Sequence, residues 1–444
     1  MRFYINSFMS LARLISVVAS IYGTLAGTSA YAIPSEPRKS VLPSSEPKSP
    51  EKSANIEFRK GIEAQLKGKN DLAQSHYLAA LKRDAKFAPA LIGLADIALR
   101  QGNRSQAETY LKQADAAAPK AAEVHLAWGR FYLGTKQFEQ AEASFKLARD
   151  LNPKAVPPLL ELGDLYLRDT SRRSDAADSF AAAVALEPGN KFAVYSYGVA
   201  SAMLGRRDDA LKAFEKAAEL APRDPAPLRA AGRLYLEAGD TDKALKSFDL
   251  GLKRQPNFVP LMLDRSDALA RQGKWPEAIR QLNDALRVAP KSSEVRVKLG
   301  DAYQSTQQWD KARAAYTKAI ELNDKNPLAY NNLAWMMVQQ GVTPEKAVEA
   351  AKKAVSLAPD SAPFLDTLGW AQRAAGDLPA AAESLQRATK IEPNSSEFQL
   401  HYGIILLDLK RTADAREALN RAIDPHSPKT TDEAKKLLRT LQAN

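Results

Sequence analysis

The chain has 444 residues, which is too long for one ordinary hydrophobic core unless the fold is modular. Apolar residues make up 45% and charged residues 26%, as in folded proteins, and the absence of cysteine excludes disulfides, thiolate zinc sites and cysteine nucleophiles. The formal net charge is +11, but Lys and Arg are spread among 52 acids without a dense basic block, so we expect no nucleic-acid partner.

Residues 1–32 have the three-part organisation of a secretory signal peptide. Two arginines are the only charges, the apolar stretch "LISVVASIYGTL" follows, and the segment ends in "AYA", a small-x-small cleavage pattern. The apolar stretch is short for a membrane span, so we expect cleavage after Ala32 and no transmembrane domain in the mature chain. An uncleaved N-terminal anchor and a mitochondrial presequence are the alternative interpretations.

Residues 33–53 read "IPSEPRKSVLPSSEPKSPEKS", in which proline, serine and charge dominate. Such a segment has almost nothing to bury, because it contains few apolar side chains. We therefore predict a disordered linker between the cleavage site and the folded part.

From residue 54 onward, one pattern of small and large residues recurs eleven times. Nine units have 34 residues and two have 35, and both extra residues fall between two apolar periodic runs, where a loop absorbs an insertion. The predicted units are 54–87, 88–121, 122–155, 156–190, 191–224, 225–258, 259–292, 293–326, 327–361, 362–395 and 396–429.

Three positions of each unit hold small residues. The second is alanine in every unit, from Ala73 to Ala415, and the third is alanine in all units but one, which has Gly251. The first position, called the small column below, holds Gly61, Ala95, Gly129, Gly163, Gly198, Gly232, Ser266, Gly300, Ala334, Gly369 and Gly403. Small side chains at matched points let two helices approach closely, while large residues such as Phe180 fill the remaining space.

Each unit contains two runs with helical apolar spacing, which a glycine often separates and a proline often closes. These features resemble the tetratricopeptide repeat family, whose unit is a 34-residue helix–turn–helix. The resemblance implies an all-α, right-handed superhelical solenoid of about eleven such units. After it, residues 430–444 offer a capping box, Thr430-x-x-Glu433, and we expect a C-terminal capping helix that covers the open end of the stack.

The resemblance also implies where function lies, because in this family the first helix of each repeat lines the concave face. Exposed aromatic residues beside arginines are typical binding anchors, and the expected site is the groove that holds a helix or an extended peptide of a protein partner. The candidate partner-binding residues are Tyr195, Arg229 and Arg233 in the central units, and Asn331, Trp335, Asp366, Trp370 and Arg373 in the later units.

Two alternatives remain open for these residues. Trp335 and Trp370 could pack between neighbouring helices instead of binding a partner, since large apolar side chains at helical spacing usually belong to the core. Some family members clamp a terminal carboxylate with paired asparagines and lysines, which Asn331 and Asn332 resemble, but the matching lysines are missing from "FLDTLGWAQR" in the next unit.

The sequence contains no recognisable catalytic, cofactor-binding or metal-binding motif. The four histidines are spread over three repeats without ligand spacing, and neither a glycine-rich phosphate loop nor a nucleophile elbow is present. We therefore predict a non-enzymatic scaffold without a cofactor.

The cellular setting is implied by the predicted export and by resemblance alone. The segments "YNNLAW", "DTLGW" and "HYGIILLDLKR" are similar to the C-terminal repeats of exosortase-linked proteins associated with exopolysaccharide. This implies an exported bacterial protein, in the periplasm or associated with the cell envelope, that supports polysaccharide export or envelope assembly. The alternative is direct binding of an anionic polysaccharide along a basic groove.

Overall fold

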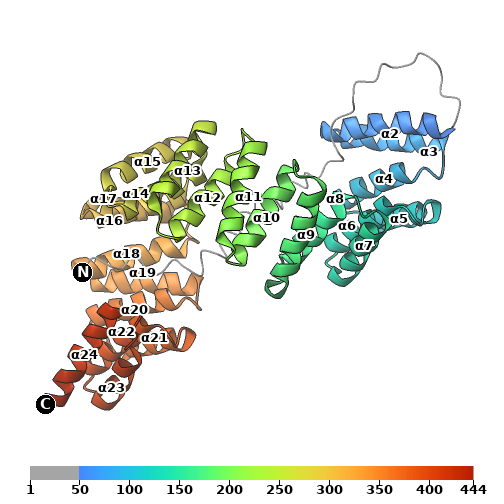
Figure 1. The fold of residues 1–444 in the computed structure, drawn as a ribbon. Helices are drawn as coiled ribbons and strands as arrows, with labels where there is room; N and C mark the ends of the chain where they lie inside the picture. Colours follow the sequence, from blue (N-terminus) through green and yellow to red (C-terminus); the bar gives the residue numbers. More distant parts are fainter. Residues whose placement is uncertain (1–49, 444) are drawn as a thin grey trace. The chain divides into compact units, whose positions relative to one another are not determined.

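The computed structural model describes residues 50–443, so the predicted signal peptide and all but the last four residues of the predicted linker lie outside the described part. Within this range the regular structure comprises 23 α-helices and one short 3-10 helix, η1 (Thr170–Arg172), with no strand (Figure 1). The prediction of an all-α fold is confirmed.

The helices follow one another as eleven pairs, which are completed by a single last helix. The first helices of the pairs are α2 (Pro50–Leu66), α4 (Ala88–Arg100), α6 (Ala122–Gly134), α8 (Val156–Tyr166), α10 (Lys191–Met203), α12 (Ala226–Glu237), α14 (Val259–Arg271), α16 (Ser293–Ser305), α18 (Pro327–Gln340), α20 (Ala362–Ala374) and α22 (Ser396–Asp408). The second helices are α3 (Asn70–Arg83), α5 (Arg104–Ala117), α7 (Phe138–Leu151), α9 (Arg173–Leu186), α11 (Arg207–Leu220), α13 (Thr241–Arg254), α15 (Trp275–Val288), α17 (Trp309–Leu322), α19 (Pro344–Leu357), α21 (Leu378–Ile391) and α23 (Thr412–Arg421). The last helix is α24 (Pro428–Ala443).

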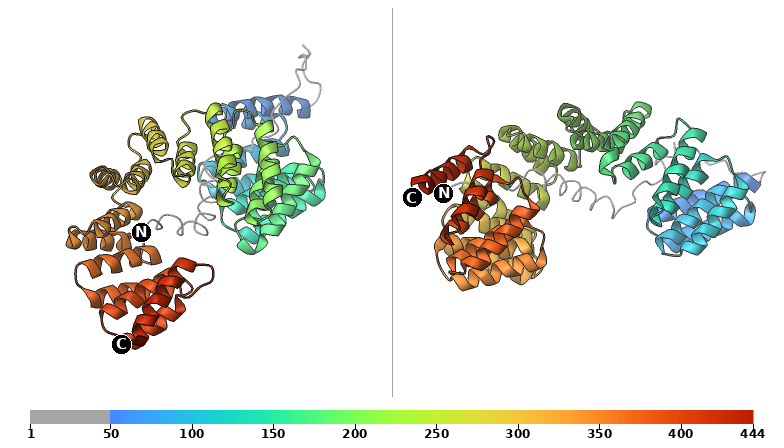
Figure 2. Two further views of the ribbon diagram at one scale, coloured as in Figure 1. Left: turned by 60° about the vertical axis from the view of Figure 1, so that its left-hand side comes forward. Right: turned by 90° about the horizontal axis from the view of Figure 1, so that it is seen from below.

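The chain divides into two compact units, whose described parts are residues 50–234, the N-terminal unit, and residues 235–443, the C-terminal unit. In each unit a helix contacts the next one along the chain, and first helices also contact the first helix of the following repeat, as α4 contacts α6 and α18 contacts α20. Figure 2 shows this stacking of pairs, for example from α18 to α24. The order of contacts within each unit is that of a solenoid, in which a repeat touches only its neighbours.

The small column sets the distance between the two helices of a repeat. A Cβ atom on Gly163 would lie 2.5 to 2.8 Å from three ring atoms of Phe180, so the ring of α9 packs directly on the backbone of α8. Phe180 itself is completely buried. In the second repeat the large residue is a leucine and the first helix carries a Cβ, in the buried pair Ala95 and Leu111. The two positions therefore share one fixed volume.

The turn between the paired helices requires a left-handed backbone. Seven glycines have positive φ there, among them Gly239 at +81°. The third, eighth and eleventh repeats place Lys136, Gln307 and Lys410 at the same position, with φ between 60° and 63°. Glycine adopts this conformation without steric cost, whereas a side chain strains it, so the glycines are explained by backbone geometry.

Two helix boundaries differ from the sequence-based prediction. Helix α2 starts at Pro50 rather than Ala54, because Pro50 fits the first helical position and Glu51 complements the helix dipole. Helix α24 starts at Pro428, which likewise fits the first helical position, and Thr430 lies inside the helix, so the predicted capping box is wrong. Instead, Thr431 Oγ1 accepts a hydrogen bond from Asp424 N at 2.8 Å. Helix α24 covers buried Leu400, Leu419 and Ala422 with its own Ala434.

Candidate functional site

The first helices of the C-terminal unit carry five of the eight candidate residues. Gly369 of α20 faces α21, where a Cβ atom would lie 2.8 Å from Leu385. Because an α-helix turns by about 100° per residue, Trp370 leaves α20 on a different side from Gly369, and Asp366 and Arg373 lie on the same side of α20 as Trp370. Asn331 and Trp335 occupy the corresponding side of α18, and α18 contacts α20. We call Trp335, Trp370 and Arg373 the anchor surface.

Trp370 lies between the side chains of Arg373 and His401, which both lie against its ring. The Arg373 guanidinium carbon lies 5.1 Å from the indole centroid, within the range of a cation–π contact. The ring of His401, from α22, meets the indole at a centroid distance of 5.1 Å and an interplanar angle of 86°. Trp370 remains partly exposed, although its indole nitrogen is buried and makes no hydrogen bond among the described residues. The side chain is therefore held by its neighbours without being enclosed in the core.

Arg373 and Asp366 both connect α20 to α22. Arg373 Nε donates to Asp408 Oδ2 at 2.6 Å, so its charge is balanced by the next repeat. Asp366 is only 3% exposed and its Oδ1 lies 2.6 Å from His401 Nδ1. The expectation that Asp366 is exposed is therefore wrong, because the stacking of α22 covers its carboxylate and supplies a partner for it.

Asn331 and Trp335 of α18 are both partly exposed. Asn331 Nδ2 lies 3.3 Å from Asn332 Oδ1, and Asn331 Oδ1 is buried without a hydrogen bond within residues 50–443. Asn332 Nδ2 donates to Asp301 Oδ1 at 2.8 Å. A terminal carboxylate at Asn332 would meet the Asp301 carboxylate, so this arrangement does not favour the clamp.

Tyr195, Arg229 and Arg233 come together in the N-terminal unit. The Tyr195 ring packs against Phe214 with a centroid distance of 5.6 Å. Burial raises the pKa of Tyr195 to about 12; Asp224 also raises it, while Arg229 and Arg233 lower it, which places both arginines near the phenol. These three residues thus form a cluster on α10 and α12 that is separate in sequence and in unit from the anchor surface.

Polar contacts also join successive first helices, and they were not predicted from the sequence. They join residues 31 or 35 positions apart, so an acid at that spacing from a basic or amide side chain is the signal that could have found them. Such contacts include Arg130 with Glu161, Lys298 with Asp267, Asn332 with Asp301, Asp366 with His401, and Arg373 with Asp408. His401 and Asp408 are thereby added to the candidate site.

Within the described part of the chain, little supports a metal site, a chemical role for His76 or His125, or a membrane span. Within residues 50–443 no group of three or more His, Asp or Glu side chains is arranged to hold a metal ion. His76 lies 2.9 Å from Glu57 and His125 lies 2.8 Å from the Pro119 carbonyl, so both rings serve local contacts. Between Pro50 and Ala443, none of the helices combines the length and apolarity that a membrane span needs.

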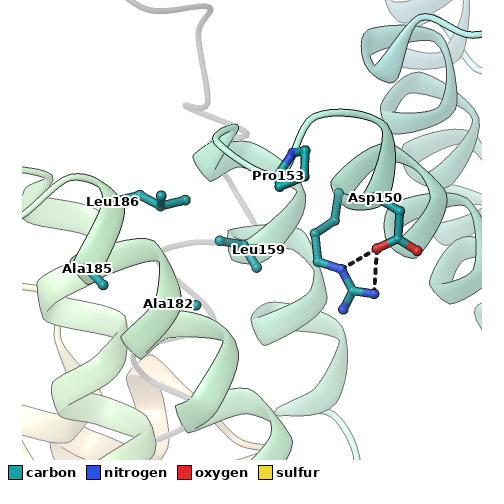
Figure 3. Close-up of a pocket in the computed structure, with 7 residues that line it drawn as sticks. Asp150, Pro153, Leu159, Ala182, Ala185 and Leu186 are labelled. Carbon is teal, nitrogen blue, oxygen red and sulfur yellow. Dashed lines mark hydrogen bonds and ion pairs between the residues drawn. The ribbon is translucent and has the colours of Figure 1, made fainter.

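A hollow of about 400 Å³ lies in the N-terminal unit among α7, α8 and α9 (Figure 3). Its lining is mostly apolar, and Arg149 and Asp150 pair with each other at 2.8 Å, so no set of polar groups converges there. The lining residues are Arg149, Asp150, Pro153, Leu159, Ala182, Ala185 and Leu186. None of them is a sequence-predicted candidate.

Known proteins resemble this chain in parts. BBSome complex member BBS4 from Bos taurus is 31% identical over 134 residues, which are 30% of this chain and 25% of that protein. Hsp70-Hsp90 organizing protein 2 from Arabidopsis thaliana is 27% identical over 132 residues, 28% of this chain and 23% of that protein. The chain thus spans about a quarter of the length of these curated relatives.

The crystal structure of yeast Tom70 superposes with a TM-score of 0.51 at 14% identity, covering 88% of this chain and 96% of that one, which shows the fold alone. Two family models described as tetratricopeptide repeat match residues 64–131 and 160–225. A third, described as the cilia and flagella-associated protein 70 C-terminal domain, matches residues 200–437, more than half of the chain. The chain therefore belongs to the tetratricopeptide repeat proteins, within the family of that C-terminal domain.

Proposed function

We propose that the chain is a non-enzymatic scaffold that binds protein partners, and that the anchor surface is its main contact. The observation that carries this proposal is the position of Trp370, partly exposed and held between Arg373 and His401 on a first helix. Tryptophan and arginine are the residue types in which binding energy concentrates at protein interfaces. A side chain already held by its neighbours also loses less conformational entropy when a partner binds.

The charge of this surface supports a protein partner rather than a polyanion. Arg373 is paired with Asp408, and farther along the first helices Lys298 is paired with Asp267. Paired bases offer little net positive charge to an anionic glycan, whereas an aromatic ring beside a balanced ion pair suits a helix or an extended segment of mixed composition. Salt-sensitive binding of a purified anionic polysaccharide, without any protein, would favour the glycan alternative.

A photo-crosslinking amino acid at position 370 tests the proposal in cells. Trp309, at the start of the second helix α17, provides a matched control position. We expect a discrete protein adduct from position 370 and none from position 309. Identical adducts from both positions, or none from either, would count against the anchor surface.

The captured partner then allows a quantitative test with Trp370→Ala. We expect an affinity loss of ~2 kcal/mol or more, about thirty-fold, with a nearly unchanged melting temperature. If Trp370 serves packing instead, the fold should lose ~3–5 kcal/mol while the folded fraction binds normally.

We further propose that this scaffold is exported and works in the bacterial cell envelope, in polysaccharide export or envelope assembly. Support comes from the sequence of residues 1–32 and from the resemblance of the late repeats to exosortase-linked proteins, both given above. N-terminal sequencing of the native protein should return Ile33 as the first residue. A chain that retains Met1 in a membrane fraction would contradict cleavage after Ala32.

A further inference from the structure

His401 is the buried residue that lies between the anchor surface and the end of the solenoid. Its side chain is 8% exposed, its Nδ1 lies 2.6 Å from Asp366 Oδ1, and its ring meets Trp370 edge to face. Asp366 and Trp370 belong to α20, whereas His401 belongs to α22, which in turn contacts α24. One imidazole thus touches a partly exposed aromatic residue and a buried carboxylate of the preceding repeat.

The surroundings of His401 favour its charged form. Glu397 lies one turn earlier on α22, Glu433 comes from α24, and Asp366 comes from α20, so acids face the imidazole from three helices. Burial lowers the pKa of His401, but Asp366 and the two glutamates outweigh burial and raise the pKa above its usual value. Burial likewise raises the pKa of Glu397, while His401 lowers it.

We propose that His401 is the positioning residue of Trp370: as an imidazolium it neutralises Asp366 and fixes the indole at the anchor surface. This inference rests on the proposed function for its significance, because a fixed Trp370 matters only if Trp370 meets a partner. The charge is what distinguishes this role from packing. A neutral imidazole keeps its size and can still donate from Nδ1, but it leaves the carboxylates of Asp366 and Glu397 uncompensated in a partly buried place.

The sign of the pH dependence follows from the raised pKa. In the unfolded chain His401 loses its proton near its usual value of about 6.5, and in the folded chain it does so at higher pH. The fixed position of the indole is therefore fully present at acidic pH and is lost as the pH rises through the folded-state pKa. A purely structural contact would show no such transition.

Fluorine NMR of the full chain labelled with 5-fluorotryptophan tests the proposal without a partner. The chain has five tryptophans, and Trp370→Phe identifies the Trp370 signal by its loss. We expect that signal to shift between pH 5.5 and 9 with a midpoint above about 6.5, while the Trp309 signal shows no such midpoint. A Trp370 signal without a midpoint in this range would overturn the proposal.

Two variants assign the transition to the pair. His401→Gln should abolish the Trp370 midpoint, whereas the control His125→Gln, in the N-terminal unit, should leave it unchanged. Asp366→Asn keeps the imidazole but removes its countercharge, so the midpoint of the Trp370 signal should move to lower pH. An unchanged midpoint in either His401→Gln or Asp366→Asn overturns the proposal. If His401→Gln does not fold, the pH titration of the wild-type chain and that of Asp366→Asn still test the proposal.

Failure of this inference is distinguishable from failure of the proposed function. A pH-dependent Trp370 signal without a crosslinked partner at position 370 would leave the positioning role intact and refute the binding site. A crosslinked partner with a pH-independent Trp370 signal would support the binding site and refute the positioning role of His401.

Discussion

The shared volume between the two helices of a repeat can be tested at Gly163 and Phe180. In Gly163→Ala the new Cβ atom would lie 2.5, 2.6 and 2.8 Å from three ring atoms of Phe180, and contacts of a Cβ atom below 3.0 Å essentially do not occur in proteins. Phe180 is fully buried and cannot swing out to relieve them. Overpacking of this kind costs ~1–3 kcal/mol, whereas alanine gains ~1 kcal/mol over glycine within a helix. We expect net destabilisation of about 1 kcal/mol.

The decisive measurement is a double-mutant cycle, read out by denaturant unfolding and by hydrogen exchange of α8 and α9. Phe180→Leu alone should cost ~1–2 kcal/mol by the cavity that it leaves. The double variant reproduces the pairing of Ala95 with Leu111 in the second repeat, so the coupling should be favourable by ~0.5 kcal/mol or more. A stabilised Gly163→Ala protein, or a coupling near zero, would refute the shared-volume explanation.

Two further predictions concern other repeats. Ala244→Leu places a large side chain at a fully buried position beside Phe248 and Leu261 and should destabilise the fold by ~1–3 kcal/mol. The loss of hydrogen-exchange protection should be confined to α13 and its neighbours, and a uniform loss in both units would contradict a solenoid. Burial and the nearby Glu161 raise the pKa of Asp164 to about 7, against the opposing effect of Arg168. The folded chain therefore holds the carboxyl proton of Asp164 more tightly than the unfolded chain does, and the protein loses stability as the pH rises from about 4 to about 7. Asp164→Asn should therefore stabilise the protein by ~1–2 kcal/mol at pH 8, discounted for the partial exposure of the side chain, and leave it unchanged at pH 4; equal effects at both values would show that Asp164 does not titrate in this range.

The helices could be predicted from the sequence because each position of the repeat meets a local requirement. Gly163 must be small where Phe180 packs, and Gly239 must adopt a positive φ between two helices. Such requirements recur every 34 or 35 residues and reinforce one another. The ends of the array lack this repetition, which is why the starts of α2 and α24 were misplaced by a few residues.

The candidate site could be predicted only in part, because it depends on how neighbouring repeats stack. Helix periodicity places Trp370 and Arg373 on one side of α20, but it does not tell which residue of α22 comes to lie opposite. The contact of Asp366 with His401 arises across 35 residues, from the register of two first helices. Sequence reasoning that treats each repeat alone assigns Asp366 to an exposed position and overlooks His401.

The position that follows the small column shows what the fold leaves undetermined. Its occupants differ in size, charge and polarity, although the helices that carry them are alike. They are Ile62, Asp96, Arg130, Asp164, Val199, Arg233, Asp267, Asp301, Trp335, Trp370 and Ile404. Since aliphatic, acidic and basic residues all satisfy the helix geometry here, packing alone does not require two tryptophans in successive repeats. The small column and its aromatic partners thus account for the architecture, while the adjacent position is available for recognition, and this is where Trp335 and Trp370 of the anchor surface lie.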